Sequence, residues 1–328
     1  MKAIVYNKYG GIEDLQMKEV EKPSPKDKEV LVKVHAVSIN DWDWGKLDGN
    51  SLFNRLFSGL WKPRDQILGS DIAGQIEVVG KDVHKFQKGD EVFGDLSGKW
   101  GGFAEYVCAN EKVLVLKPSA MTFEEAAAIP QAAMLAVQGL IDKGNIKNEQ
   151  QLLINGAGGG VGTFGLQIAK LYGATVTVVD SSSKLDMLLS LGADKFIDYA
   201  KEDFTKNGLR YDLILDVKTN RSIFHYLGAL NPNGIYVTVG GSMSRLLQTF
   251  ILKPLISIFS KKKVRIVMLK PNKDLAYINE LFQAGKIKPI IDGYYNLEEV
   301  PNAFRLFSKA GHKGKIVISV DDIKARKA

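Results

Sequence analysis

A run of glycines at residues 154–165, Ile-Asn-Gly-Ala-Gly-Gly-Gly-Val-Gly-Thr-Phe-Gly, is the segment with the clearest chemistry. It follows an apolar segment typical of a strand (151–155) and opens a segment typical of a helix (161–172). Glycines at such a junction permit a tight turn and let main-chain N–H groups approach a pyrophosphate, and the helix start favours an anion. The run therefore predicts a dinucleotide-binding loop, and a purely structural tight turn is the alternative. The residues predicted to bind the cofactor here are Gly156, Gly158, Gly159, Gly160, Val161 and Gly162.

The next predicted strand, residues 175–179, leads into Asp180, eighteen residues past Gly162. An acidic residue at about this spacing binds the adenosine ribose hydroxyls, and its charge disfavours a 2′-phosphate, which favours NAD. Ser181, Ser182 and Lys184 instead supply donors and a positive charge suited to NADP. Ser and Asp are also good helix caps. The sequence predicts NADPH or NADH without choosing between them.

Cysteine and histidine are too few and too scattered to suggest a metal site. The single cysteine, Cys108, lies in an alternating run and fits a buried, unreactive thiol better than a nucleophile. The four histidines show no ligand-like spacing; they are His35, His84, His225 and His312. We therefore predict no metal ligands.

Strands and helices alternate around the glycine run. Thr122-Phe-Glu-Glu125 has the spacing of a capping box and predicts a helix start, and Pro130 should end that helix before a second begins. Strands are predicted at 151–155, 175–179, 213–216 and 235–239 with helices between them, an order that gives a parallel sheet with helices on its faces. Earlier in the chain, short strands at 29–37, 75–79 and 106–108 are separated by Gly and Pro, which suggests a barrel-like unit. A last strand at 315–319 is a candidate to return to that unit.

The composition is that of a globular protein. The chain has 328 residues, 45% hydrophobic and 25% charged, and this length favours two domains over one. The net charge is +7, with the basic residues taken as spread through the chain, so a solvated basic surface is favoured over a nucleic-acid site. The first residues lack the apolar stretch of a secretion signal, so we expect a cytoplasmic protein.

The most apolar segment is residues 246–259. It is interrupted at Lys253-Pro254, is too short to span a bilayer, and is followed by three lysines at 261–263. The segment fits a core helix with a soluble basic end, which we favour, or a helix that rests on an anionic membrane surface.

Many segments, in order, resemble the medium-chain dehydrogenase/reductase superfamily, and within it the zinc-independent quinone oxidoreductase and alkenal/enone reductase branch. The resemblance covers nearly the whole chain. Besides the glycine run it is carried by residues 1–5, 67–74, 78–80, 88–94, 102–106, 191–194, 197–199, 285–289 and 314–318. It implies an α/β protein with a GroES-like β-rich catalytic domain (1–120), a Rossmann domain with a doubly wound parallel sheet (121–265), and a return to the catalytic domain (266–328).

The resemblance also implies an activity. This is NAD(P)H-dependent transfer of hydride to a quinone or an α,β-unsaturated carbonyl, in a protein that is commonly a homodimer. Zinc alcohol dehydrogenases of the superfamily present Cys and His where this chain has 40–43 and 69–71, without either, so zinc is not expected. A conjugated acceptor needs less activation, because charge arriving with the hydride is delocalised onto oxygen. The alternatives are a cofactor-binding scaffold or nucleic-acid binder without turnover, and a metal-dependent alcohol dehydrogenase.

Catalytic positions follow from the resemblance as well. Asn40 and Asp43 match polar positions implied to orient the substrate or the nicotinamide ribose. Lys46 lies one step beyond the base that relatives often carry, and a solvated lysine is an equal alternative. The aromatic residues of the same region suit a flat apolar substrate pocket or plain core packing; they are Trp42, Trp44, Phe53, Phe57 and Trp61.

Further cofactor positions are implied in the same way. Tyr199 matches a contact to the adenosine phosphate, and Gly240 and Gly241 match the loop that faces the nicotinamide. Lys315 matches a family position with a weaker claim to the cofactor. Relatives often place Thr near the nicotinamide where this chain has Leu135, and Gln131 is the candidate to replace its hydrogen bond.

Overall fold

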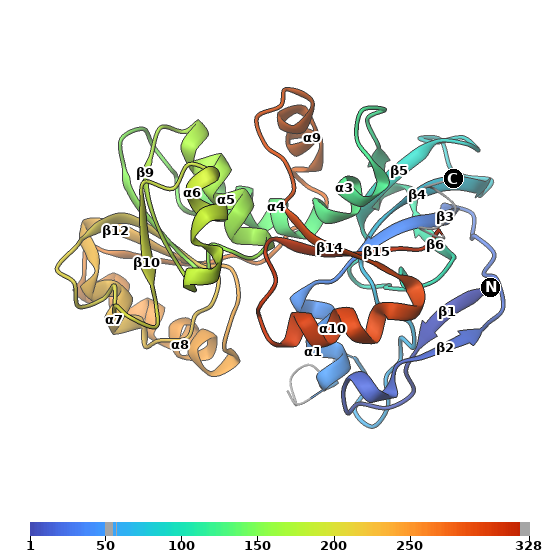
Figure 1. The fold of residues 1–328 in the computed structure, drawn as a ribbon, viewed down its shortest axis with the longest axis horizontal. Coiled ribbons are helices and arrows are strands. Elements are labelled where there is room, and N and C mark those ends of the chain that lie inside the picture. The colour runs from blue at the N-terminus through green and yellow to red at the C-terminus, as the bar shows by residue number, and fades with distance from the viewer. Residues whose placement is uncertain (50–54, 57, 322–328) are drawn as a thin grey trace. The chain divides into compact units, whose positions relative to one another are not determined.

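The computed structural model describes residues 1–49, 55, 56 and 58–321 and divides the chain into two compact units (Figure 1). The first unit comprises Met1–Gln131, Pro271–Asn279 and Pro289–Ala328. The second comprises Ala132–Lys270 and Glu280–Lys288. Each has a buried apolar core of its own, so each can be described as a separate folding unit.

The first unit is built on a mostly antiparallel sheet in the order β14-β15-β3-β4-β5-β7, with β6 also paired to β3, beside a two-stranded sheet of β1 and β2. Its strands are β1 (Lys2–Val5), β2 (Gln16–Glu19), β3 (Glu29–Ser38), β4 (Asp71–Val79), β5 (Glu91–Asp95), β6 (Tyr106–Asn110), β7 (Val115–Leu116), β14 (Ile291–Asn296) and β15 (Lys315–Ser319). Its helices are α1 (Asp41–Asp48), α3 (Phe123–Ala128) and α10 (Val300–Ser308), with 3₁₀ turns at Ile12–Asp14, Glu111–Val113 and Leu297–Glu299. The strands predicted at 29–37, 75–79 and 106–108 are confirmed as β3, the second half of β4 and the first part of β6.

The last strand closes this unit. β15 pairs antiparallel with β3, with Val317 opposite Ser38, and parallel with β14. All five of its residues are buried, which fits an interior strand of near-continuous apolar sequence. The predicted return of residues 315–319 to the first unit is confirmed, and it brings Lys315 beside residues that lie 275 positions earlier in the chain.

The second unit contains a six-stranded, fully parallel sheet in the order β10-β9-β8-β11-β12-β13. Numbered from its first strand this is the order 3-2-1-4-5-6 of the Rossmann fold. The strands are β8 (Gln151–Asn155), β9 (Thr175–Asp180), β10 (Lys195–Asp198), β11 (Tyr211–Asp216), β12 (Leu230–Thr238) and β13 (Lys263–Ile266). The helices are α5 (Gly160–Leu171), α6 (Leu185–Ser190), α7 (Ile223–Gly228) and α8 (Met243–Phe259), with a π-helical turn at Gln138–Lys143 and a 3₁₀ turn at Ser182–Lys184. The chain passes between the units at four places, two of which lie in helices α4 (Pro130–Val137) and α9 (Leu275–Gln283).

Local sequence rules account for the start of α3. The Thr122 hydroxyl accepts the Glu125 N–H (3.1 Å), and the Glu125 carboxylate accepts the Thr122 N–H (2.9 Å). Each side chain thus satisfies a main-chain donor that the helix leaves free. Helix α3 ends at Ala128 and α4 begins at Pro130, as predicted.

The unit boundaries differ from the expected domain ranges. Helix α3 packs on β3 and β4 and so belongs to the first unit. Residues 266–270 and 280–288 belong to the second unit because Gln138 and Gln167 exchange two hydrogen bonds each with the main chain of Lys270 and Lys288. Each glutamine amide donates to a main-chain carbonyl and accepts a main-chain N–H, as the backbone of a neighbouring strand does. These contacts join residues more than 100 positions apart and have no local sequence signal.

Residues 246–259 also depart from the expectation. They form one continuous helix, α8, which runs through Pro254 instead of breaking there. Only Thr249 and Ile256 of this helix are buried. The favoured interpretation as a core helix is therefore wrong, because most of its apolar side chains face solvent.

Candidate functional site

The glycine run connects β8 to α5. The N–H groups of Gly156 and Ala157 both donate to the Val179 carbonyl (3.0 and 3.3 Å), so the turn is fixed to the end of the neighbouring strand β9. Gly156 has φ +84°, where a side chain would be strained. A Cβ on Gly162 would lie 2.4 Å from Ala157 Cα, so glycine there allows α5 to pack against the turn.

The start of α5 is open. Gly159 precedes the first helical residue, Gly160, and a Cβ on Gly159 would meet nothing within 4 Å. Gly159, Gly160 and Val161 are only partly buried. The first N–H groups of a helix have no partner within it, and the helix dipole makes this end positive. The geometry therefore provides space and donors for an anion, as a pyrophosphate requires.

Asp180, at the end of β9, lies beside the same loop. Its Oδ2 accepts the Gly158 N–H (2.7 Å), and its Oδ1 accepts the Ser181 N–H (2.9 Å). Lys184 Nζ lies 3.4 Å from Oδ1, and both side chains of this pair are more than nine-tenths buried. The Lys184 chain also covers Gly158, where a Cβ would lie 2.3 Å from Lys184 Cδ. Asp180 and Lys184, which sequence considerations set in opposition, thus form one ion pair.

Two predicted adenosine contacts lie next to this pair. The Tyr199 N–H donates to the Asp180 carbonyl (3.3 Å), and the Tyr199 side chain is 59% exposed. The Ser181 hydroxyl bonds to that of Ser183 (2.9 Å), and Ser182 is exposed. The structure therefore gathers Asp180, Ser181, Lys184 and Tyr199 at the carboxyl ends of β9 and β10.

The strand order reverses between β8 and β11, and the carboxyl ends of such strands form the ligand crevice of doubly wound sheets. The Asn155 amide donates to Asp216 Oδ1 (2.8 Å), which joins these two strand ends. A Cβ on Gly156 would lie 2.7 Å from Lys218 Cγ, and one on Gly241 would lie 1.9 Å from the Lys218 carbonyl oxygen. Gly241 has φ +122°, so this close approach requires glycine. The second predicted glycine site, Gly240-Gly241, therefore lies next to the first, with exposed Lys218 between them.

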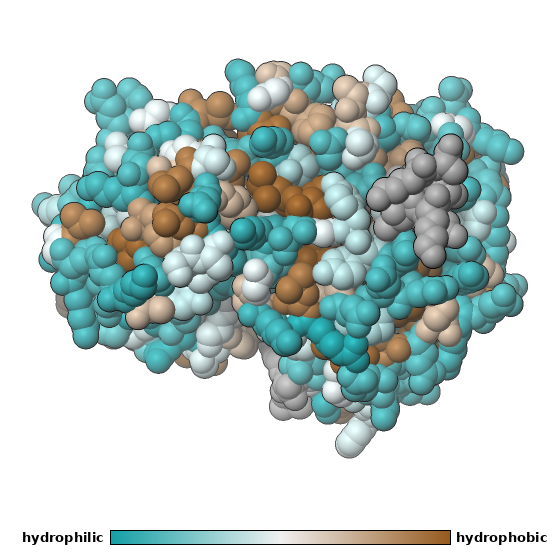
Figure 2. All heavy atoms as spheres, in the orientation of Figure 1, coloured by the Kyte–Doolittle hydropathy of each residue, from teal (hydrophilic) through white to brown (hydrophobic). Residues whose placement is uncertain are grey.

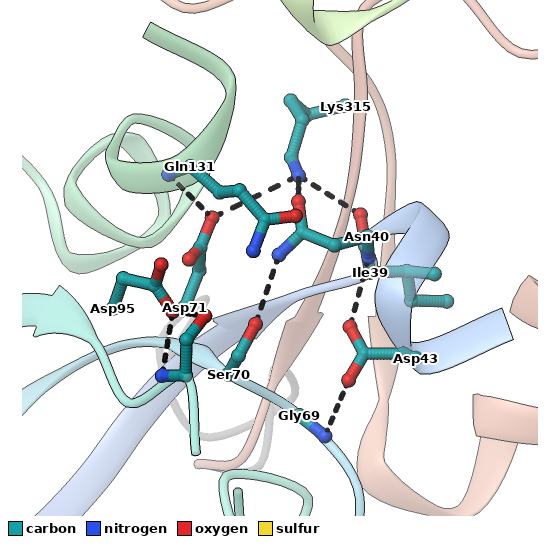
Figure 3. Close-up of polar contacts among 10 residues, drawn as sticks. Ile39, Asn40, Asp43, Gly69, Ser70, Asp71, Asp95, Gln131 and Lys315 are labelled. Atoms are coloured by element: carbon teal, nitrogen blue, oxygen red, sulfur yellow. Dashed lines mark hydrogen bonds and ion pairs between the residues drawn. The ribbon is translucent and has the colours of Figure 1, made fainter. Parts of the chain in front are cut away.

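In the first unit, Asn40 and Asp43 hold the start of α1 (Figure 3). Asp43 Oδ2 accepts the Asn40 N–H (2.9 Å), and Oδ1 accepts the Gly69 N–H (2.9 Å). Asp43 has no exposed surface, and burial raises its pKa to about 6 against the lowering effect of the two N–H donors. Because both carboxylate oxygens are bonded to the main chain, the structure gives Asp43 a positioning role.

The Lys315 ammonium contacts Ile39, Asn40 and Asp71 of this polar cluster (Figure 3). Its Nζ donates to the carbonyl of Ile39 (2.9 Å) and to Asn40 Oδ1 (2.5 Å), and it lies 4.0 Å from Asp71 Oδ2. The Asn40 amide in turn donates to the Ser70 hydroxyl (3.2 Å). Burial lowers the pKa of Lys315, and the surrounding carboxylates oppose that effect. Lys315, which the resemblance links weakly to the cofactor, thus contacts the predicted catalytic residue Asn40.

A pair of buried carboxylates completes the cluster. Asp71 of β4 stands directly opposite Asp95 of β5, and neither has exposed surface. Burial and the facing carboxylate raise the pKa of Asp71 well above its usual value, and burial raises the pKa of Asp95. The Gln131 N–H donates to Asp71 Oδ2 (3.1 Å). Two facing buried carboxylates cannot both ionise cheaply, which accounts for the direction of the Asp71 pKa shift.

Lys46 has different partners from Asn40 and Asp43. Its Nζ lies 2.5 Å from Asp65 Oδ2 and 3.6 Å from the ring centroid of Trp100. It is neither solvated nor part of the Lys315 cluster. The structure thus supports a paired, buried lysine over the solvated alternative.

The aromatic residues of this region do not form a single group. Trp44 packs against Phe304, with ring centroids 6.4 Å apart, whereas Trp42 and Trp61 are 57% and 89% exposed. Phe53 and Phe57 lie outside the described residues. Of these three tryptophans, only Trp44 packs against the core of the first unit.

Comparison with known proteins identifies the family. Residues 26–119 match the model of the alcohol dehydrogenase GroES-like domain, and residues 191–318 match that of a zinc-binding dehydrogenase. The chain is 32% identical to the chloroplastic NADPH-dependent alkenal/one oxidoreductase of Arabidopsis thaliana, over 97% of this chain and 79% of the relative. It is also 32% identical to a chloroplastic quinone-oxidoreductase homolog of Spinacia oleracea, over 97% and 98%. The chain belongs to the medium-chain dehydrogenase/reductase superfamily.

Solved structures agree with this family. The quinone oxidoreductase of Coxiella burnetii superposes with a TM-score of 0.87 at 27% identity, covering 98% of this chain and 99% of that one. The predicted fold class is confirmed: a GroES-like domain joined to a Rossmann domain with a parallel sheet. The first unit is thus the family's catalytic domain, and the second its nucleotide domain.

The donor set of the catalytic domain does not fit a zinc ion. Where zinc enzymes of the superfamily present Cys and His, this chain places Asn40 and Ser70 beside the Lys315 ammonium. Zinc prefers thiolate and imidazole ligands, and neither Asn40 nor Ser70 supplies one. Over residues 1–49, 55, 56 and 58–321 no group of three His, Cys, Asp or Glu side chains is arranged to hold a metal.

Asp71, Asp95 and Lys218 were not assigned a role from the sequence. Asp71 and Asp95 face each other only through the register of β4 with β5, which short-range patterns do not define. Lys218 could have been predicted as a ligand-site residue from the sequence. It follows the predicted strand 213–216, whose carboxyl end lies at the switch point of a doubly wound sheet.

Proposed function

We propose that the chain is an NAD(P)H-dependent oxidoreductase that transfers hydride to a quinone or an α,β-unsaturated carbonyl. The observation that carries the proposal is the open start of α5 at Gly159. Empty space and the main-chain N–H groups of the first helical turn lie together there, at the switch point of a Rossmann sheet. Relatives at about 30% identity over nearly the full chain are named as alkenal/one and quinone oxidoreductases, which supports this acceptor class.

The nucleotide domain would hold the cofactor. The first-turn N–H groups of α5 bind the pyrophosphate, and Asp180, Ser181, Ser182, Lys184 and Tyr199 surround the adenosine ribose. Gly241 packs closely on the Lys218 main chain, and Gly240, where a Cβ would meet nothing within 4 Å, leaves room for the nicotinamide half. When bound, the reduced nicotinamide supplies the hydride.

Asn40 is the residue we assign to the acceptor in the catalytic domain. Its amide oxygen accepts from the Lys315 ammonium, which polarises the amide and strengthens its N–H donors. The amide donates to Ser70 and also to the Asp71 carboxylate, so an oxygen that gains negative charge would replace one of these two acceptors. Asp43 positions Asn40 by fixing α1, and water supplies the proton that completes reduction of an enone.

The reaction as proposed needs no zinc. The acceptor's own conjugation spreads the arriving charge, and Lys315 supplies the fixed positive charge of the cluster through Asn40. NADPH preference depends on whether the Lys184 ammonium can leave Asp180 for a 2′-phosphate. A homodimer and a cytoplasmic location are also part of the proposal.

Steady-state oxidation of NADPH and NADH, each with 9,10-phenanthrenequinone and with a short alkenal, tests the proposal. We expect turnover with at least one conjugated acceptor and none with a saturated alcohol plus the oxidised cofactor. Turnover should persist after dialysis against a chelator, with metal content measured on the same sample. Cofactor binding without turnover on either acceptor would reduce the protein to a binding scaffold and refute the assignment.

A further inference from the structure

Three strands of the nucleotide domain end in an aspartate that a lysine follows within four residues. The pairs are Asp180 and Lys184 at the end of β9, Asp198 and Lys201 at the end of β10, and Asp216 and Lys218 at the end of β11. The carboxyl ends of these parallel strands lie at one edge of the sheet, where doubly wound sheets bind ligands. In the first two pairs the lysine Nζ lies 3.4 and 3.8 Å from a carboxylate oxygen of its aspartate. The third pair is different.

The carboxylate of Asp216 is already satisfied by other donors. Its Oδ1 accepts the Asn155 amide (2.8 Å) and the N–H groups of Lys218 (3.1 Å) and Thr219 (2.9 Å). Its Oδ2 accepts the Tyr236 hydroxyl (2.7 Å), and the whole side chain is buried. Within residues 1–49, 55, 56 and 58–321 no hydrogen bond or ion pair to the Lys218 ammonium is found. Asp216 therefore fixes the main chain of Lys218 and leaves its charge for another partner.

The side chain of Lys218 points away from the loop assigned to the nicotinamide. The Lys218 carbonyl lies against Gly241, which follows β12, whereas the Lys218 side chain lies against Gly156, which follows β8. In the sheet, β11 lies between β8 and β12, and β9 lies beyond β8. The side chain thus extends across the end of β8 toward β9, the strand that ends in Asp180. This is the side of the sheet assigned to the adenosine ribose.

Lys218 and the Asp180–Lys184 pair border the same glycine turn. A Cβ on Gly156 would lie 2.7 Å from Lys218 Cγ and 3.3 Å from its Cε, so the lysine stem runs along this glycine. A Cβ on Gly158 would lie 2.3 Å from Lys184 Cδ and 3.0 Å from Asp180 Oδ2. The turn 156–158 therefore has one lysine at each end, and only Lys184 has a carboxylate beside it.

Exposure by itself gives a lysine no role. Hydrophilic residues predominate on the face of the molecule drawn in Figure 2, and most lysines of a globular protein are exposed. Lys218 is distinguished by the fixed position of its main chain and stem, combined with an ammonium that has no partner in the described structure. A cation held in this way loses little conformational freedom when it binds an anion.

We propose that Lys218 binds the 2′-phosphate of NADPH and is a determinant of cofactor choice. NADPH differs from NADH only in this phosphate on the adenosine ribose, and a phosphate monoester carries a charge of about −1.5 to −2 at pH 7. Lys184 can reach the phosphate only by leaving Asp180, whereas Lys218 has no carboxylate to leave in the part of the chain that the structure describes. The inference rests on the proposed function, because it requires a dinucleotide at the glycine turn.

Dissociation constants for NADPH and NADH, measured by isothermal titration calorimetry, test this role. Lys218→Met keeps the stem along Gly156 and removes the charge, so we expect it to weaken NADPH about tenfold relative to NADH, as for one hydrogen bond between charged groups. Lys218→Arg keeps the charge and should keep the wild-type preference. The control Lys147→Met removes an exposed lysine that precedes β8, at the opposite end of that strand, and should bind both cofactors like the wild type. All variants should keep the wild-type unfolding midpoint.

Two fragments of the cofactor identify the phosphate. Lys218→Met should bind adenosine 2′-monophosphate about tenfold more weakly than the wild type does, and adenosine 5′-monophosphate equally well. A loss for the 5′-monophosphate as large as that for the 2′-monophosphate would assign the ammonium to the pyrophosphate and overturn the proposal. So would an unchanged ratio of the NADPH and NADH dissociation constants in a Lys218→Met variant that binds both, and this result would leave the proposed function intact. A wild type that binds neither dinucleotide would instead refute the proposed function, and the role of Lys218 with it.

Discussion

The Asp180–Lys184 pair makes a testable prediction about cofactor choice. Asp180 holds the Gly158 N–H and the Ser181 N–H and also neutralises Lys184. Replacing Asp180 with Asn keeps the size of the side chain and one acceptor oxygen for these donors, but removes the charge. The Lys184 ammonium then loses the carboxylate at 3.4 Å, which lowers the cost of moving it to a 2′-phosphate.

The magnitude follows from that distance. At 3.4 Å the attraction between the two charges is about 1 kcal/mol at the dielectric constant of water and about 5 kcal/mol at an effective value of about 20. Binding of NADPH must overcome this attraction in the wild type and not in the variant. Since 1.4 kcal/mol corresponds to a factor of ten, even the lower figure predicts a gain of at least about fivefold for NADPH relative to NADH.

Dissociation constants for NADPH and NADH, measured by quenching of protein fluorescence, give the ratio directly. We expect Asp180→Asn to raise the NADPH preference at least about fivefold, and Asp180→Asn/Lys184→Met to show no such gain. An unchanged ratio in a single variant that still binds both cofactors would show that the pair does not face the ribose.

Three further predictions concern the glycine loop and the buried carboxylates. Gly159→Asp should leave the free energy of unfolding near that of the wild type, because a Cβ at this position meets nothing within 4 Å. The same variant should abolish cofactor binding, because it places a negative charge at the anion site. The control Gly228→Asp, at an equally open position, should bind the cofactor like the wild type. Gly162→Ala should lower the free energy of unfolding in urea by about 1–3 kcal/mol, because its Cβ would overlap the Ala157 main chain, and an unchanged midpoint would show that the helix can shift freely. Asp43 has a folded pKa of about 6, above its usual 3.8, so its protonated form favours the folded chain and that stability is lost as the pH rises toward 6. Between about pH 4.5 and 7.5 the wild type should therefore lose about 2 kcal/mol more than Asp43→Asn, and parallel pH curves for the two would contradict the assignment.

Features set by neighbouring residues were predicted well from the sequence. The capping box at Thr122, the strand ends around the glycine loop and the spacing to Asp180 all depend on contacts within a few residues or within one strand–helix–strand unit. Their outcome follows from local rules of capping, turn geometry and strand order.

Features set by distant pairing were not predicted. Lys315 reaches Asn40 across 275 positions because β15 pairs with β3, and Asp71 meets Asp95 through the register of two antiparallel strands. The sequence also misled about α8, since an apolar helix is usually buried and composition alone does not tell which face meets solvent. In each case the contact that decides the outcome joins residues too far apart in the sequence for a local pattern to predict it.

The central claim is that hydride passes directly from a reduced nicotinamide held at the glycine loop to a conjugated acceptor. The most direct test supplies NADPH deuterated at the transferable C4 position together with a short alkenal, and locates the label by mass spectrometry and NMR of the product. The account predicts one deuterium at the β-carbon of the saturated aldehyde for each NADPH consumed. Saturated aldehyde without deuterium at that carbon, or NADPH that binds yet is never oxidised by either the alkenal or 9,10-phenanthrenequinone, would contradict it.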